Sequence, residues 1–244
     1  MISVCLASYN GESYIREQID SILSQLSRDD ELIISDDSSL DNTVDIVKSY
    51  NDDRIKLISF VRDKSIYKKS SRLITTNFEN ALMYAKGEHI FLSDQDDIWL
   101  PGKVQMCLAA LKQADLVVHD CIVVNSIKER LYDSYFDLIK IHGGFYSNFL
   151  KIKYLGCCMA FNRNILDAVL PMKPYIAHDT WFCLLSELLF KTARLPQQLV
   201  LYRRHENNMS TATETSCNPL WFKIYYRIPI LLAVFTRYFK YKLG

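Results

Sequence analysis

The sequence predicts an α/β fold in which helices flank a mostly parallel central sheet. Its first hundred residues contain short apolar runs that do not alternate with polar residues, as expected for strands buried on both faces. Segments with apolar residues at helical spacing separate these runs. This alternation of strand and helix is typical of a parallel sheet covered on both sides.

The apolar runs predict strands at residues 2–7, 31–35, 55–60 and 89–93. A first helix is indicated by apolar residues at helical spacing, namely Ile15, Ile19, Ile22, Leu23 and Leu26.

Two capping patterns predict where the next helices begin. Ser38 with Asp41, and Thr76 with Glu79, each resemble a capping box ahead of an apolar helical segment. Gly87 then follows the second segment and is predicted to end that helix.

The composition sets broad limits on location and partners. The 244 residues fit one large domain with a small appendage, and a net charge of +1 gives no reason to expect a nucleic-acid partner. The seven cysteines, mostly within apolar runs, indicate a reducing cytoplasm. The chain opens directly into a strand, which argues against a signal peptide, and no apolar run reaches the roughly 18 residues that span a membrane.

Polar clusters follow three of the predicted strands. They read Ser8-Tyr9-Asn10-Gly11, Asp36-Asp37-Ser38-Ser39 and Asp94-Gln95-Asp96-Asp97. Ligands of parallel sheets bind beyond the carboxyl ends of the strands, so we expect these three clusters to converge on one binding site.

The third cluster favours a bound cation. In an extended chain Asp94 and Asp96 share a face, and carboxylates about 4 Å apart near a surface repel by roughly 4 kcal/mol. The alternative for this cluster is a solvated acidic loop. For the second cluster, the alternative is that Asp36 and Asp37 are turn residues that hydrogen-bond the local backbone. The segment lacks the Gly and Glu of an EF-hand loop, and the chain has neither a P-loop nor a dinucleotide fingerprint. Carboxylates with Mg²⁺ or Mn²⁺ would hold a diphosphate instead.

Three longer stretches resemble the bacterial family 2 glycosyltransferases of the GT-A fold. They are SVCLASYNGESYIREQIDSIL, DELIISDDSSLDNT and GEHIFLSDQDDIWLPGK, followed by weaker matches at GCCMAFNRN, HDTW and LYRRHENNMS. The resemblance implies a GT-A fold, a nucleotide-diphosphate-sugar donor, a divalent metal (Mn²⁺ or Mg²⁺) and inversion at the anomeric carbon.

The resemblance also implies roles for individual residues. The segment around Ala7, Ser8 and Tyr9 would line the base, and Asp37 would approach the uridine. Asn10 and Asp36 would also contact the nucleotide sugar. Asp94 and Gln95 would contact the rest of the donor, with Asp94 near the ribose. Asp96 would hold the metal, so that Asp94-Gln95-Asp96 is the D-x-D motif of the family.

The attacking acceptor hydroxyl must lose a proton, so the site needs a general base. Asp179 is the candidate, because it falls where the family usually has a Glu-Asp pair. His178 replaces the Glu, which leaves open whether His178 shares the proton transfer or shapes the acceptor pocket. The alternative is that Asp179 only caps the apolar helix that follows it.

Three further side chains are candidates for the site. His205 lies in a segment from which related enzymes reach the metal or the diphosphate, although a surface histidine is the alternative. Trp181 and Asp97 are predicted to contact the acceptor sugar, with a core position as the alternative for Trp181. The segment RRHENN replaces the Q-x-x-R-W motif of processive relatives, which predicts transfer of one sugar per encounter.

Residues 219–244 form a basic, aromatic tail. They include five Lys or Arg, eight aromatic residues and no acid. The tail is predicted to be a helix that Pro229 breaks or kinks. It would either dock on its own domain or lie at a membrane surface, with aromatic residues at headgroup level and cations on anionic lipid.

We therefore expect residues 1–218 to form the catalytic domain, with 1–115 binding the nucleotide sugar and 116–218 the acceptor. The expected activity is transfer of a hexose from UDP-glucose or another UDP-hexose to a lipid-diphosphate-linked sugar during synthesis of O-antigen or another surface polysaccharide. dTDP-rhamnose is the alternative donor, and a sugar-nucleotide pyrophosphorylase or a non-catalytic binding protein are other classes. The expected location is the cytoplasmic face of the bacterial inner membrane.

Overall fold

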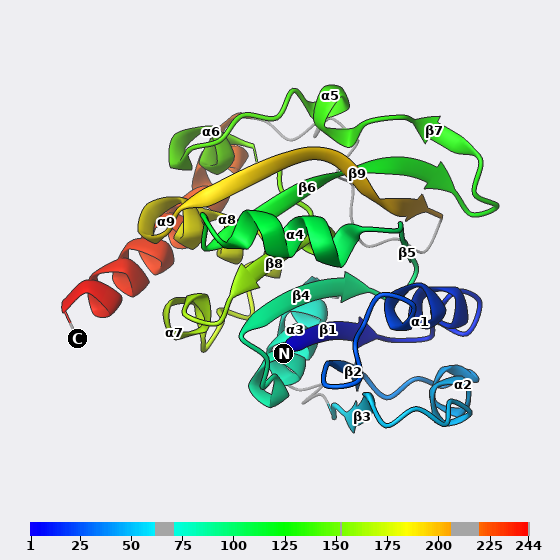
Figure 1. The fold of residues 1–244 in the computed structure, drawn as a ribbon. Helices are drawn as coiled ribbons and strands as arrows, with labels where there is room; N and C mark the ends of the chain where they lie inside the picture. Colours follow the sequence, from blue (N-terminus) through cyan, green and yellow to red (C-terminus); the bar gives the residue numbers. More distant parts are fainter. Residues whose placement is uncertain (62–70, 152, 206–219, 244) are drawn as a thin grey trace.

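The computed structural model describes residues 1–61, 71–151, 153–205 and 220–243. Its strands are β1 (Ile2–Ser8), β2 (Glu31–Asp36), β3 (Ile55–Ser59), β4 (His89–Asp94), β5 (Ile98–Trp99), β6 (Leu116–Asn125), β7 (Arg130–Tyr132), β8 (Met159–Asn162) and β9 (Thr192–Arg204). Within these ranges they form one sheet in the order β3-β2-β1-β4-β8-β6-β9-β5, with β7 beside β6 (Figure 1).

The helices cover this sheet. They are α1 (Ile15–Leu23), α2 (Thr43–Lys48), α3 (Ser71–Tyr84), α4 (Lys103–Leu111), α5 (Tyr135–Ile139), α6 (Phe145–Leu150), α7 (Ile165–Val169), α8 (His178–Leu189) and α9 (Leu220–Leu243), with a 3₁₀ turn at Gly156–Cys158. The predicted α/β class, with a mostly parallel sheet flanked by helices, is confirmed.

The first four strands form the parallel part of the sheet. β1 lies between β2 and β4, and β3 lies beyond β2, all in parallel. The side chains of β2 are buried along its whole length, and those of β1 at all but one position. Continuous apolar runs are what strands covered on both faces require, and this is why the sequence located them within a residue or two.

The second half of the chain continues the same sheet. β8 pairs antiparallel with β4, and β6 pairs antiparallel with β8. β9 then runs parallel to β6, and the short β5 pairs with β9. Because one sheet includes strands from both halves, the end of β9 lies close to the segment that follows β4.

The predicted helix starts at Ser38 and Thr76 are wrong. α2 begins at Thr43, whose N–H donates to Asp41 Oδ1 at 3.0 Å. Ser38 has a φ of 57° and its hydroxyl donates to the carbonyl of Phe60, so it belongs to a turn. Thr76 lies inside α3, which begins at Ser71.

Gly87 is required by close packing rather than by helix termination. α3 ends three residues earlier, at Tyr84. A Cβ at Gly87 would lie 2.5 Å from the backbone nitrogen of Ser3, which no side chain tolerates. Gly87 therefore allows the turn before β4 to pass directly over β1.

The tail forms a single helix that docks on the domain. α9 continues through Pro229, so the predicted break is wrong. Ile230, Ala233 and Val234 are buried where α9 packs against α7 and α8. Arg237 also donates to the carbonyls of Leu170 and Pro171. This packing offsets the hydrogen bond that a proline removes from a helix. None of the helices in the described ranges is long and apolar enough to cross a membrane.

Candidate active site

The three polar clusters converge on one edge of the sheet, as the sequence predicts. Ser8 pairs with Asp36 across β1 and β2, and Ala7 pairs with Asp94 across β1 and β4. The Ser8 hydroxyl donates to Asp36 Oδ1 at 2.9 Å, and the N–H of Asp37 donates to the Ser8 carbonyl at 2.9 Å. Both Asp36 and Asp37 are buried at this edge. Asp36 also accepts from the N–H of Ser39 at 2.9 Å, so it fills the turn role left open for it as well.

Hydrogen bonds join the loops that follow these strands. Gln95 accepts from the N–H of Tyr9 at 2.8 Å and donates to the Tyr9 carbonyl at 3.0 Å. Gly11 lies so close to the Gln95 side chain that a Cβ would collide with it. Asn10, at a φ of 48°, accepts from the N–H of Leu40 at 2.8 Å. The loops therefore form one continuous surface.

Two amides on α3, which sequence reasoning did not identify, support this surface from below. Asn77 donates to the Ser8 carbonyl at 3.1 Å, and Asn80 donates to the Ser35 hydroxyl at 2.8 Å. Their spacing of three residues on a helix that packs against β1 and β2 was the available signal.

The carboxylates at the end of β4 lie close enough together to raise the pKa values of Asp94 and Asp97. Burial raises the pKa of Asp94 well above its ordinary value, and the charges of Asp97, Asp96 and Asp179 raise it further. Burial and the charge of Asp96 raise the pKa of Asp97 to about 7. The predicted base Asp179 therefore lies within electrostatic range of the predicted donor residue Asp94. Excess negative charge at this position favours a bound cation.

Asp96 and His205 are in direct contact. His205 Nε2 lies 2.8 Å from Asp96 Oδ2, and the imidazole stacks on the Tyr14 ring at a centroid distance of 4.8 Å. The two side chains are 10% and 15% exposed, so the pair is open to solvent on one side. A carboxylate with an imidazole suits Mn²⁺, and a carboxylate alone suits Mg²⁺.

A second set of potential ligand atoms lies deeper. Asp94, Asp97 and Cys157 each offer one atom, and these atoms lie within 4.8 Å of one another. Asp97 is fully buried, and a thiol is a soft ligand that suits Mg²⁺ and Mn²⁺ poorly. We therefore favour Asp96 and His205, on the open side of the cluster, as the ligands of a hard cation.

Asp97 does not face an acceptor, so that prediction is wrong. Its Oδ1 accepts from the backbone N–H of Arg203 at 3.0 Å, while its Oδ2 has no hydrogen-bond partner among the described residues. Asp97 instead fixes the end of β9, from which His205 follows.

Asp179 lies in the first turn of α8. The cap position belongs to Ala177, and Asp179 Oδ1 accepts from the N–H of Thr180 at 2.6 Å. Asp179 is half-buried. It therefore contacts the helix terminus without being its N-cap, and capping does not account for the whole residue.

His178 and Trp181 are packing residues. The His178 ring lies 4.2 Å from the Phe78 ring and against Gly156, and burial lowers its pKa. Trp181 is fully buried, and its indole N–H donates to the Val169 carbonyl at 2.8 Å. A buried ring offers no face to an acceptor sugar, so the acceptor role predicted for Trp181 is wrong. His178 is likewise buried against Phe78 and Gly156, so we do not assign proton transfer to it.

Residues 3–170 match the model of glycosyl transferase family 2. The chain belongs to this family. The match includes β1 to β4 and the carboxylate cluster after β4, and it disfavours the pyrophosphorylase alternative.

Curated relatives of the chain include bacterial enzymes that transfer glucose or rhamnose. The chain is 35% identical over 111 residues to WfgD of Escherichia coli, a UDP-Glc:alpha-D-GlcNAc-diphosphoundecaprenol beta-1,3-glucosyltransferase. That alignment covers 46% of this chain and 41% of WfgD. The dTDP-rhamnosyl transferase RfbG of Shigella flexneri is 27% identical over 228 residues, covering 83% of this chain and 72% of RfbG.

Solved structures of glycosyltransferases share the fold. S. aureus TarS in complex with UDP-GlcNAc superposes with a TM-score of 0.67 at 18% identity, over 98% of this chain and 72% of TarS. Glucosyl-3-phosphoglycerate synthase from Mycobacterium tuberculosis, in complex with Mn²⁺ and UDP, has a TM-score of 0.56 at 17% identity, over 97% of this chain and 79% of that one. The fold is therefore the GT-A fold that the sequence predicts.

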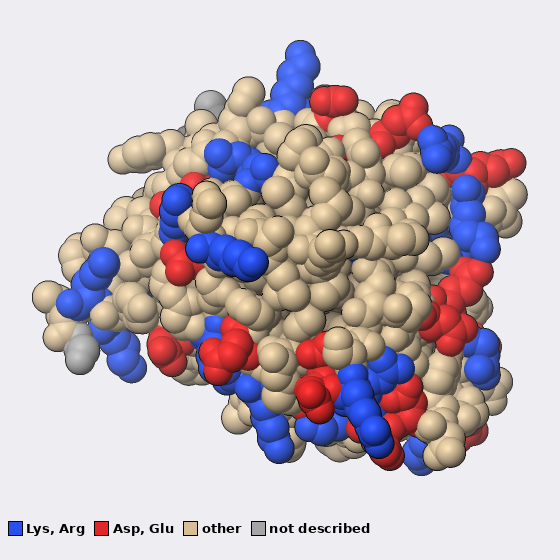
Figure 2. Space-filling view, viewed as in Figure 1, with Lys and Arg blue, Asp and Glu red and all other residues tan. Residues whose placement is uncertain are grey.

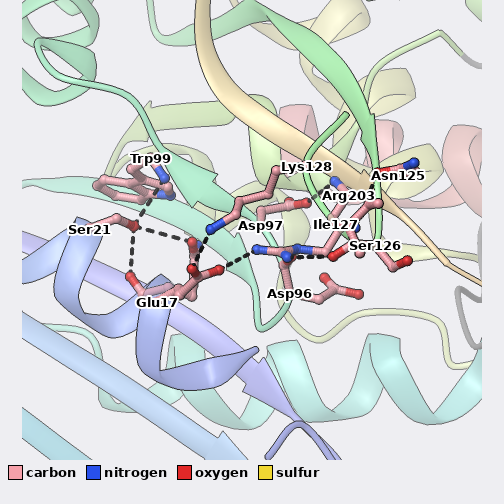
Figure 3. A network of polar contacts seen from close by, with 11 residues as sticks. Glu17, Ser21, Asp96, Asp97, Trp99, Asn125, Ser126, Ile127, Lys128 and Arg203 are labelled. Atoms are coloured by element: carbon pink, nitrogen blue, oxygen red, sulfur yellow. Dashed lines mark hydrogen bonds and ion pairs between the residues drawn. The ribbon is translucent and has the colours of Figure 1, made fainter. Parts of the chain in front are cut away.

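The structure of this family 2 member also reveals Arg203, which sequence reasoning did not single out (Figure 3). Its guanidinium donates to the carbonyls of Asp96 at 2.8 Å and Ser126 at 3.0 Å, and to Glu17 at 2.7 Å. It also lies over the Tyr14 ring at 4.8 Å, and the residue is 3% exposed. Arg203 thus joins α1, β9 and the D-x-D segment. Because every residue has a main-chain carbonyl, the sequence gives no sign of the contacts that Arg203 makes with Asp96 and Ser126.

Proposed function

We propose that this enzyme transfers a hexose from UDP-glucose or another UDP-hexose to a lipid-diphosphate-linked sugar, with inversion and one sugar at a time. The observation that carries the proposal is the contact between Asp96 and His205 beside the converging strand ends. The sequence similarity to WfgD supports a glucosyl donor and a lipid-linked acceptor.

Asp96 and His205 would hold Mn²⁺ or Mg²⁺, which when bound stabilises negative charge on the departing diphosphate. The nucleoside would lie over Ala7 to Asn10, with Asp36, Asp37, Asp94 and Gln95 around the uridine and ribose. In this placement the nucleotide lies on the surface formed by the loops that the hydrogen bonds between Tyr9 and Gln95 join.

Asp179 would act as the base. Its carboxylate takes the proton of the acceptor hydroxyl while that oxygen forms a bond to the anomeric carbon. The bond between that carbon and the diphosphate oxygen breaks, and UDP leaves with the electron pair. Two features of Asp179 support this role: it is only half-buried, and its charge contributes to raising the pKa of Asp94.

Transfer of rhamnose from dTDP-rhamnose is the second candidate. It is favoured by the similarity to RfbG, which extends over 83% of this chain and thus includes the acceptor half. The UDP-hexose proposal rests on a shorter alignment with higher identity.

The direct test supplies the full-length enzyme and Mn²⁺ with a polyprenyl-diphosphate-linked GlcNAc acceptor. Radiolabelled UDP-glucose and dTDP-rhamnose are compared in parallel reactions, and the lipid extract is analysed. We expect label from UDP-glucose in the lipid product. Label from dTDP-rhamnose alone would establish the second candidate, and label from neither, with UDP binding intact, would leave a binding protein without transferase activity.

We also propose that the enzyme associates peripherally with the inner face of the bacterial inner membrane, through residues 219–244. The exposed aromatic residues and the cations of α9 support this. A chain that ends at Asn218 is expected to lose sedimentation with anionic liposomes while still binding UDP and Mn²⁺. Equal sedimentation of both chains would contradict the proposal.

A further inference from the structure

We infer that α6 and α9 together form one surface that lies flat on an anionic lipid bilayer, so that the tail is only part of the membrane-binding face. The inference rests on the lipid-linked acceptor of the proposed function. The two helices are distant in sequence but pack together (Figure 1). The Phe145 and Phe235 rings meet edge to face at 5.9 Å, and Arg227 donates to the Phe149 carbonyl at 3.0 Å.

Seven of the exposed apolar side chains described on α9 share one side of the helix, while Tyr226, 52% exposed, lies off that side. They recur every three or four positions: Trp221, Tyr225, Ile228, Leu232, Phe235, Phe239 and Leu243. Ile230, Ala233 and Val234 are buried on the opposite side, against the domain. Because α9 is held along its underside, its apolar side can lie along a surface but cannot insert end-on.

α6 extends this apolar side. Tyr146 is 82% exposed and Leu150 is 68% exposed, although both are large apolar residues on a helix whose other face is packed. Exposed apolar groups gathered in one patch mark an interaction surface, whereas scattered single ones do not. The patch made by α6 and α9 is therefore a candidate for contact with another apolar phase.

The charge around α6 and α9 indicates that this apolar phase is an anionic lipid bilayer. Lys140 and Lys151 are exposed on either side of α6, and Lys240 and Lys242 are exposed on α9. Neither α6 nor residues 219–244 contain Asp or Glu, and residues 219–244 contain five Lys or Arg in all. The chain as a whole carries 29 basic and 28 acidic residues, so the rest of it is acidic overall. Figure 2 shows basic side chains at the projecting tip of α9. Two copies of this surface would repel each other, whereas anionic headgroups would attract it.

The position of the surface also suits a lipid-borne acceptor. α9 packs against α8, the helix whose first turn carries the proposed base Asp179. Burial, and with it the charge of Asp179, raises the pKa of Tyr226 in the first half of α9. A bilayer against α6 and α9 would therefore present the head of a lipid-linked sugar close to Asp179.

The test uses the full-length protein with vesicles of phosphatidylglycerol and phosphatidylcholine, and with phosphatidylcholine alone. Tyr146→Ser/Leu150→Ser removes the α6 contribution and leaves the tail intact. The matched control is Leu131→Ser/Tyr132→Ser on β7, where Leu131 is 48% exposed and Tyr132 is 46% exposed. Trp221 is an internal reporter, because it is 68% exposed while Trp99 and Trp181 are buried.

We expect binding to the anionic vesicles, a blue shift of Trp221 emission, and clearly weaker binding of the α6 variant but not of the control. Equal binding by the α6 variant would exclude α6, and failure of the full-length protein to bind would exclude the whole surface. A dimer seen by light scattering, and lost in the α6 variant, would identify a second copy as the occupant instead. Transfer to a short-chain, water-soluble acceptor reports the proposed function separately and is expected to be unchanged in the α6 variant.

Discussion

His205 Nε2 and Asp96 Oδ2 lie 2.8 Å apart although 109 positions separate the two residues. The contact exists because β9 runs alongside β6 in the same sheet as β4. β9 ends beside the loop that follows β4. It joins the donor half of the chain to the second half at the point where a metal would bind.

If both side chains are ligands, His205→Ala weakens Mn²⁺ binding at least about tenfold, because one of two protein ligands is lost. Isothermal titration of Mn²⁺ in the presence of UDP measures this. The control is His142→Ala, at an exposed histidine outside the site. Unchanged Mn²⁺ affinity in His205→Ala would show that the imidazole only packs on Tyr14.

Asp179→Asn is expected to slow transfer by at least about 100-fold, the usual cost of losing a general base, because an amide cannot take the proton. UDP affinity should change little. Asp167→Asn is the matched control, since Asp167 is an exposed acid in the first turn of α7. Turnover within a few-fold of the wild type would remove Asp179 from the chemistry.

Arg203→Lys keeps the positive charge but cannot reproduce the three separate hydrogen-bonded contacts of the guanidinium. We expect Mn²⁺ affinity and turnover to fall about tenfold, since the variant loosens the main chain of Asp96. Arg163→Lys is the comparison, because Arg163 also donates to main-chain carbonyls, those of Ala85 and Gly87, but lies away from the site. An equal loss of stability in both variants, with Mn²⁺ affinity intact, would reduce Arg203 to a structural role.

Asp97 should make the metal-free fold less stable as the pH rises. The pKa of Asp97 is about 7 in the fold and about 4 when unfolded, so the unfolded chain loses this proton first. The neutral form favours the fold, and that advantage disappears as the pH rises toward 7. Asp97→Asn retains the acceptor for Arg203 without the charge.

In chelator, we expect Asp97→Asn to raise the melting temperature at about pH 8 more than at about pH 5. Asp133→Asn, at an acid whose side chain is 86% exposed, provides the baseline at each pH. A gain for Asp97→Asn that does not depend on pH would contradict the assigned shift.

The sequence could predict elements whose signal is local. β1 and β2 are apolar throughout, and the polar residues that follow them stand at strand ends that a parallel sheet must align. The start of α3 was misplaced because Thr76 and Glu79 fit a capping pattern while lying inside the helix.

Other features depend on tertiary contacts that no local pattern reveals. Trp181 has the same helical spacing whether it faces a sugar or the core, and only the packing around Val169 decides. Arg203 reaches Asp96 across 107 positions through a main-chain carbonyl, which leaves no trace in residue identity.

The central claim is that Asp96 links the metal to the nucleotide, and UDP titration into the wild type and Asp96→Ala, each with Mn²⁺ and with chelator, tests it most directly. The wild type should bind UDP markedly more tightly with Mn²⁺ than with chelator. Asp96→Ala, with an unchanged circular dichroism spectrum, should bind UDP weakly and equally under both conditions, and should show no transfer. Mn²⁺-dependent UDP binding and substantial transfer by Asp96→Ala would contradict the account.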